Sequence, residues 1–115
     1  MRGDIRSAIL HTASHGHAGN HSLCHGDLGN IELILEACTQ FQEMPECGNL
    51  LQSLREAAVD GIRREGVLCE SPLAVESVGL MTGLAGIGYG FLRLADPQRV
   101  PSVLLLECPQ VAAAA

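Results

Sequence analysis

The stretches HGDLG at residues 25–29 and TGLAG at residues 82–86 decide the fold class. Each is a glycine-x-x-glycine (GxxG) turn, and each opens a run of apolar residues at helical spacing. Gly83 follows Gly26 by 57 positions (83 − 26), and a more polar helical pattern at residues 50–64 lies between the two runs. The sequence therefore predicts a repeating unit, in which a helix entered through GxxG is followed by a more polar helix.

Such a unit cannot bury its apolar face alone and needs stacked neighbours. Glycines at a helix entry let another segment approach the backbone closely. The repeat therefore fits an all-α fold that forms part of a double-layered α/α toroid, with the GxxG-entered helices inside and the polar helices outside. The glycines concerned are Gly26, Gly29, Gly83 and Gly86. Two glycine-rich helix starts can also arise by chance, and this alternative stays open at this point.

The rest of the chain is predicted to be helical as well. Apolar residues at helical spacing predict four helices, at residues 4–13, 29–43, 50–64 and 84–94. Gly66 is expected to end the third helix. Residues 103–106 are predicted to be a short buried run, whereas Glu32 and Glu36, one helical turn apart, are predicted to face solvent.

Length and composition narrow the class of protein. A chain of 115 residues is one domain at most, and 47% hydrophobic residues argue against disorder. The net charge is −6 and all seven basic residues are Arg, without a basic stripe, so nucleic acid is not an expected partner. No apolar stretch reaches the ~20 residues that span a bilayer. No signal peptide is recognised, so a cytoplasmic location is expected.

The cysteines suggest a metal site and no disulfides. Their odd number and the absence of a CxxC pair predict no disulfide framework. The five are Cys24, Cys38, Cys47, Cys69 and Cys108. Cys38 falls on an apolar helical stripe and is expected in the core, whereas Cys24 is adjacent to His25 in a glycine-rich turn. Zinc binds Cys sulfur and His nitrogen, usually four groups in a tetrahedron. A Cys that is simply buried beside a polar His remains the alternative at this point.

Several blocks of sequence carry a resemblance to a known family. SLCHGDLGN at residues 22–30 resembles the second zinc motif of lanthionine synthetases, and the preceding Asn-His at residues 20–21 is similar to their type II (LanM) subgroup. GLMTGLAGIGYG at residues 79–90 resembles the last GxxG helix of the family. LRLADP at residues 92–97 and VPSVLLL at residues 100–106 resemble the LanM C-terminal ending. By this resemblance, the chain is the C-terminal part of a LanC-like cyclase domain, an incomplete toroid over residues 1–115.

The resemblance implies a zinc-dependent cyclase. Such an enzyme adds Cys thiols of a lanthipeptide precursor peptide to dehydroalanine or dehydrobutyrine, which forms thioether (lanthionine) rings. The resemblance implies that Cys24 and His25 are zinc ligands and that the metal deprotonates the substrate thiol. Asp27 is expected either to orient His25 or to cap the following helix. His21 is a candidate acid/base residue, with a solvated loop residue as its alternative.

The chain also departs from the family pattern. The family's zinc site uses an earlier Cys in a Trp-Cys motif, and this chain contains no Trp. The acid/base His of the family and its dehydratase domain also lie upstream. The third protein ligand of the zinc is therefore expected from the remainder of the synthetase chain, and stand-alone activity is not expected. The alternatives are a non-catalytic remnant, a small helical interaction module, or a stand-alone zinc protein that uses Cys24, His25 and a local His or Cys.

Overall fold

A computed structural model describes residues 2–15, 18–41 and 44–109. Within these ranges the chain is all-α, as the sequence predicts, and contains no strand. The elements are α1 (Arg2–His15), α2 (Asp27–Gln40), α3 (Cys47–Glu65), the short 3-10 helix η1 (Pro72–Ala74) and α4 (Leu84–Ala95). None of the helices in the described part combines the length and the apolar character needed to cross a membrane.

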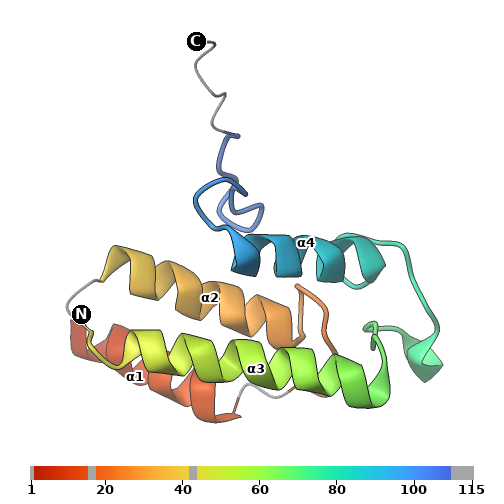
Figure 1. Ribbon diagram of the computed structural model, residues 1–115, viewed down its shortest axis with the longest axis horizontal. Helices are drawn as coiled ribbons and strands as arrows, with labels where there is room; N and C mark the ends of the chain where they lie inside the picture. The colour runs from red at the N-terminus through yellow and green to blue at the C-terminus, as the bar shows by residue number, and fades with distance from the viewer. Residues whose placement is uncertain (1, 16–17, 42–43, 110–115) are drawn as a thin grey trace.

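Helix α2 is the centre of the molecule and packs against α1, α3 and α4 (Figure 1). In the view of Figure 1, α4 runs along one side of α2, and α3 and α1 run along the other. A helix covered on several sides must be apolar around much of its circumference. The buried apolar residues of α2 are Leu28, Ile31, Ile34, Leu35 and Ala37. Its neighbours complete the core with residues that include Ile9, Leu51, Ala58, Ile87 and Leu94.

The four predicted helices are confirmed, with shifted ends. Gly66 ends α3 as expected, and its φ of 80° lies in the left-handed region that glycine adopts without a steric penalty. The second helix starts at residue 27, two positions earlier than predicted, because Gly26 is already its N-cap. Residues 42 and 43 at the end of that predicted helix lie outside the described residues.

The predicted recurrence of the GxxG-entered helix is confirmed by the hydrogen bonds of the two turns, whereas within the described residues no polar helix follows α4. Gly26 caps α2 and Gly83 caps α4, and both have extended backbones. In each unit, the first helical residue and the second GxxG glycine donate to carbonyl groups of the preceding turn. The bonds are Asp27 N to Asn20 O and Gly29 N to Ser22 O, and Leu84 N to Ser77 O and Gly86 N to Gly79 O. Corresponding atoms are 57 positions apart (84 − 27), as in the sequence repeat.

The second glycine of each motif has no room for a side chain. A Cβ atom at Gly29 would lie 2.0 Å from the carbonyl oxygen of Leu23. At Gly86 it would lie 1.6 Å from the carbonyl oxygen of Leu80. Because both obstacles are backbone atoms, no side-chain rotation can relieve them. The close approach of each turn to its helix therefore requires glycine at these positions.

The predicted solvated face at Glu32 and Glu36 is wrong, because Arg93 of α4 reaches across to both. Its Nε lies 3.0 Å from Glu32, and another guanidinium nitrogen contacts Glu36. The guanidinium also donates to the carbonyl oxygens of Pro97 and Val100. Burial opposes the charged form of Arg93, but the hydrogen bond and charge of Glu32, together with the charge of Glu36, outweigh it and raise the pKa of Arg93.

The predicted buried run at residues 103–106 is also wrong. Leu105 and Leu106 are 56% and 87% exposed. The chain turns here because Tyr89 of α4 anchors it: the phenol donates to the carbonyl oxygen of Pro101 and accepts from the amide of Val103. Val103 still packs against the core, whereas Leu104, Leu105 and Leu106 are exposed on the side of α4 that faces away from α2 in Figure 1.

The prediction of no disulfide is wrong. Cys38 near the end of α2 and Cys47 at the start of α3 form a disulfide, with their Cα atoms 5.5 Å apart. Sequence spacing did not reveal the pair because the two cysteines meet only when α2 and α3 pack as antiparallel neighbours. The three remaining cysteines are free: Cys24, Cys69 and Cys108.

Replacement of Cys38 by Ser is expected to lower the free energy of unfolding by about 2–3 kcal/mol, because the bond closes a short loop. The sequence separation of the two cysteines is nine residues. Urea denaturation without reductant should show the loss, and a thiol reductant should abolish the difference between the variant and the parent protein. Cys108→Ser, at an exposed free cysteine, is the control. A Cys38→Ser variant as stable as the non-reduced parent would contradict the prediction.

Candidate metal centre

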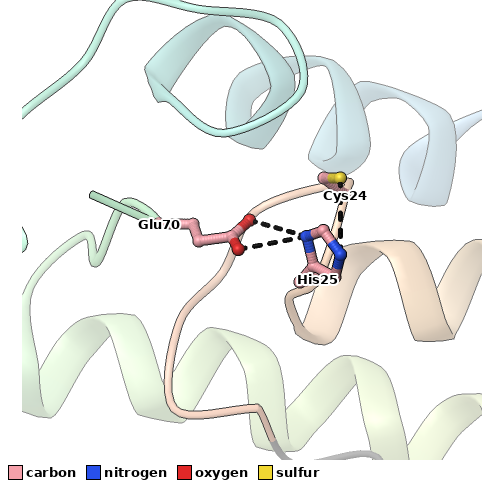
Figure 2. Close-up of side chains that lie close together, drawn as sticks. All are labelled: Cys24, His25 and Glu70. Carbon is pink, nitrogen blue, oxygen red and sulfur yellow. Dashed lines mark hydrogen bonds and ion pairs between the residues drawn. The ribbon is translucent and has the colours of Figure 1, made fainter. Parts of the chain in front are cut away.

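The candidate ligands Cys24 and His25 lie together in the turn between α1 and α2 (Figure 2). Nε2 of the His25 imidazole is 4.0 Å from the sulfur of Cys24. The other ring nitrogen, Nδ1, faces Glu70 and lies 3.0 Å from one carboxylate oxygen and 3.2 Å from the other. Ligand atoms of the three residues lie within 4.8 Å of one another. The structure thus places the sulfur and the imidazole together, with a carboxylate on the far side of the ring.

Hydrogen bonds to Met81 and within residues 20–27 hold the turn that carries Cys24 and His25. The amide of Cys24 donates to the carbonyl oxygen of Met81 at 2.9 Å, and Met81 directly precedes the second GxxG turn. The side-chain oxygen of Asn20 accepts from the amide of Ser22 at 2.9 Å, and its backbone carbonyl accepts from the amide of Asp27 at 3.0 Å. An Asn side chain that bonds the backbone two residues on is a common way to close a tight turn.

The connection between α3 and α4 brings Glu70 to the site. The amide of Glu70 donates to the carbonyl oxygen of Thr82 at 3.0 Å, which joins it to the second GxxG turn. Its carboxylate accepts from the hydroxyl of Ser22 at 3.3 Å, which joins it to the segment just before the first GxxG turn. The same hydroxyl oxygen accepts from the amide of His25 at 3.4 Å. Ser22 is fully buried, whereas the side chain of Glu70 is 33% exposed, so only the Ser22 end of this link is shielded from water.

His21, the candidate acid/base residue, is buried, so the solvated-loop alternative is wrong. The amide of Leu68 donates to Nδ1 of His21 at 2.9 Å, and the amide of His21 donates to the carbonyl oxygen of Leu68 at 2.8 Å. Because an amide N–H only donates, Nδ1 is the acceptor and the proton of the neutral ring is on Nε2. Nε2 lies toward Gly61 of α3. His21 therefore joins the turn to the α3–α4 connection.

Asp27 is the first residue of α2 and does not cap it. The N-cap is Gly26, which has no side chain to cap the helix. The carboxylate of Asp27 instead accepts from the amide of Ala18 at 3.0 Å, which ties the preceding loop to the helix. Its charge lies in the first turn, where the helix dipole favours a negative group. The carboxylate that the structure places against His25 is that of Glu70, a residue that the sequence analysis did not single out.

The donor atoms of the pair suit zinc. Zinc accepts thiolate sulfur and imidazole nitrogen, and softer sulfur ligands disfavour magnesium and calcium. Cys24 and His25 are both exposed to solvent. The two side chains supply half of a tetrahedral set, and the contact of Glu70 with the second nitrogen matches the carboxylate–histidine arrangement common behind zinc ligands.

The comparisons with known proteins give the family. The family described as lanthionine synthetase C-like protein matches residues 1–105. Neither the curated proteins nor the solved structures gave a match. The family match covers both GxxG units, the turn with Cys24 and His25, and all the helices of the described residues. The chain belongs to the lanthionine synthetase C-like family.

Proposed function

We propose that this chain is part of a zinc-dependent lanthipeptide cyclase, the C-terminal part of the cyclase domain of a type II (LanM) synthetase. The reaction adds a peptide Cys thiol to dehydroalanine or dehydrobutyrine and forms a lanthionine ring. One observation carries the proposal: in a chain of this family, the Cys24 sulfur and the His25 Nε2 face each other 4.0 Å apart on an exposed turn.

Cys24 and His25 would hold the metal through the sulfur and through Nε2. Bound zinc would lower the pKa of the substrate thiol, which is about 8.5 for a free thiol, so that the thiolate is available at neutral pH. The chain's own contribution is to hold both ligands on a hydrogen-bonded turn and to leave them open to solvent. A shallow cleft of about 500 Å³ is lined by residues 19–20 and 68–72, which include Glu70.

The proposal also implies that this chain acts together with the rest of the synthetase. The two ligands of this chain need a third protein ligand, and we assign it to the preceding part of the synthetase, together with the acid that protonates the product enolate. His21 does not enter this chemistry, because its ring is buried and bonded to Leu68. The proposal predicts that the DNA upstream of this coding region encodes a Trp-Cys zinc motif and a dehydratase domain.

The proposed location is the cytoplasm. One finding weighs against it: the Cys38–Cys47 disulfide, because such bonds are rare in reducing compartments. Thiol trapping in intact cells would measure whether Cys38 and Cys47 are reduced or form the disulfide. A pair that is mostly reduced supports the proposed location, and a pair that is fully oxidised contradicts it.

Removal of either proposed ligand is expected to weaken zinc binding by about 100-fold or more, since loss of an outer partner of a ligand already costs ~10–100-fold. Competition with a chromophoric chelator would measure the affinity of the full chain, of Cys24→Ala and of His25→Ala. Cys108→Ala is the matched control, because Cys108 is also an exposed free thiol. Zinc affinity unchanged in both ligand variants would exclude this metal site and favour a non-catalytic remnant or a helical interaction module.

A further inference from the structure

The two nitrogens of His25 have different neighbours. Nδ1 lies 3.0 Å and 3.2 Å from the two oxygens of Glu70, whereas Nε2 faces the Cys24 sulfur (Figure 2). A neutral imidazole carries one N–H and one lone pair. A carboxylate accepts and cannot donate when ionised, so the contact with Glu70 places the N–H on Nδ1. The lone pair is then on Nε2, on the side of the sulfur.

We propose that Glu70 is a positioning residue, which holds the ring and the tautomer of His25 so that Nε2 is open to the metal beside Cys24. This inference rests on the proposed function. Carboxylates behind a metal-binding His fix the orientation of the ring and make the ligand more basic. Without this contact, the exposed His25 ring populates other rotamers and the tautomer with the proton on Nε2, and both remove the lone pair from the site.

Glu70 is suited to this role because it is itself anchored. Its backbone is bonded to Thr82 of the second GxxG turn, and its carboxylate accepts from the buried hydroxyl of Ser22. The side chain of Glu70 is 33% exposed, against 71% for that of His25. The better-held group therefore determines the position of the freer one. Its origin in the α3–α4 connection also means that the second repeat unit supports the ligands of the first.

Two other roles for Glu70 make different predictions. It can be a metal ligand itself, since ligand atoms of Cys24, His25 and Glu70 lie within 4.8 Å of one another. In that case the ion lies on the Nδ1 side of the ring. The lone-pair directions of the two ring nitrogens diverge, so one ion cannot contact both. Glu70 can also be a plain surface partner of a charged His25, in which case its removal leaves metal binding nearly unchanged.

The first experiment measures Zn²⁺ affinity of the full chain by chelator competition. We expect Glu70→Ala to weaken binding by about 10–100-fold. Glu70→Gln should fall between this variant and the parent protein, since its amide oxygen still accepts from Nδ1 but without the charge. Glu76→Gln, an exposed change of the same kind in the same connection, is the control. Glu70→Ala within twofold of this control would overturn the proposal.

The second experiment uses the unaltered sequence, so it does not depend on how a variant folds. Long-range heteronuclear NMR of the His25 ring distinguishes a protonated from a metal-bound nitrogen. With Zn²⁺ or Cd²⁺ bound, we expect a proton on Nδ1 and the metal on Nε2. Metal on Nδ1 would overturn the proposal and make Glu70 a ligand. If Cys24→Ala leaves zinc affinity unchanged, the proposed function fails; if Cys24→Ala lowers it and Glu70→Ala does not, only this inference fails.

Discussion

Replacement of Arg93 by Met is expected to lower the free energy of unfolding by about 3–5 kcal/mol, the cost typical of removing one partner from a buried ion pair. Arg93 is 4% exposed, and Glu32 and Glu36 beside it are 5% and 9% exposed. Loss of the guanidinium leaves two carboxylates on adjacent turns of α2 without their cation, in a place that water hardly reaches. It also removes the donors that hold the carbonyl groups of Pro97 and Val100.

Urea denaturation followed by circular dichroism would measure this loss. Arg99→Met is the matched control, since Arg99 is 87% exposed and its ion pair with Asp96 spans 3.9 Å. Exposed pairs of this kind contribute about 0–1 kcal/mol. Adding Glu32→Leu and Glu36→Met to Arg93→Met is expected to recover much of the stability, because a buried charge cluster replaced by apolar side chains is often neutral. If Arg93→Met were no less stable than Arg99→Met, this account of the α2–α4 interface would be wrong.

Replacement of Gly86 by Ala is expected to cost about 2–3 kcal/mol, at the upper end of the usual range for overpacking. The new Cβ would lie 1.6 Å from the carbonyl oxygen of Leu80, so the turn or the helix must move. The amide of Gly86 bonds to the carbonyl of Gly79 in this turn, and the shift would strain that bond. The backbone carbonyl groups of Met81 and Thr82 accept hydrogen bonds from Cys24 and Glu70. A shift of this turn should therefore also displace the residues of the candidate metal centre.

Gly88→Ala in the same helix is the control for this prediction. A Cβ at Gly88 meets nothing within 4 Å, and Ala is the better helix former by about 0.8–1.0 kcal/mol. We therefore expect Gly88→Ala to be neutral or stabilising. Thermal unfolding of the two variants in parallel compares them, and the prediction fails if they melt at the same temperature.

The spacing of apolar residues along the chain was enough to predict the helices. Apolar spacing indicated all four, because an amphipathic helix repeats its apolar residues every three to four positions whatever it packs against. The repeat at Gly26 and Gly83 was also visible, since the close approach of backbone requires glycine at fixed offsets. The burial of residues 103–106 was predicted wrongly. An apolar run marks a buried segment only if another element covers it, and the sequence does not state whether one does.

The candidate site was predicted in part. Cys24 and His25 are adjacent in the chain, so their proximity is fixed by the backbone. Glu70 is 45 positions from His25, in a connection without regular pattern, and no local signal marks it. Nor did the sequence reveal that His21 is buried, because its burial depends on the return of the chain at Leu68.

The amino-acid sequence by itself determined the helices, the two GxxG turns, the Cys24–His25 pair and the family. All of these depend on residues that are neighbours along the chain or on their periodicity. Only the tertiary structure decided that Glu70 contacts His25, that Arg93 pairs with Glu32 and Glu36, and that Cys38 bonds to Cys47. The physical reason is that each of these pairs joins separate elements, and their relative rotation and register, set by packing around α2, decide which side chains meet.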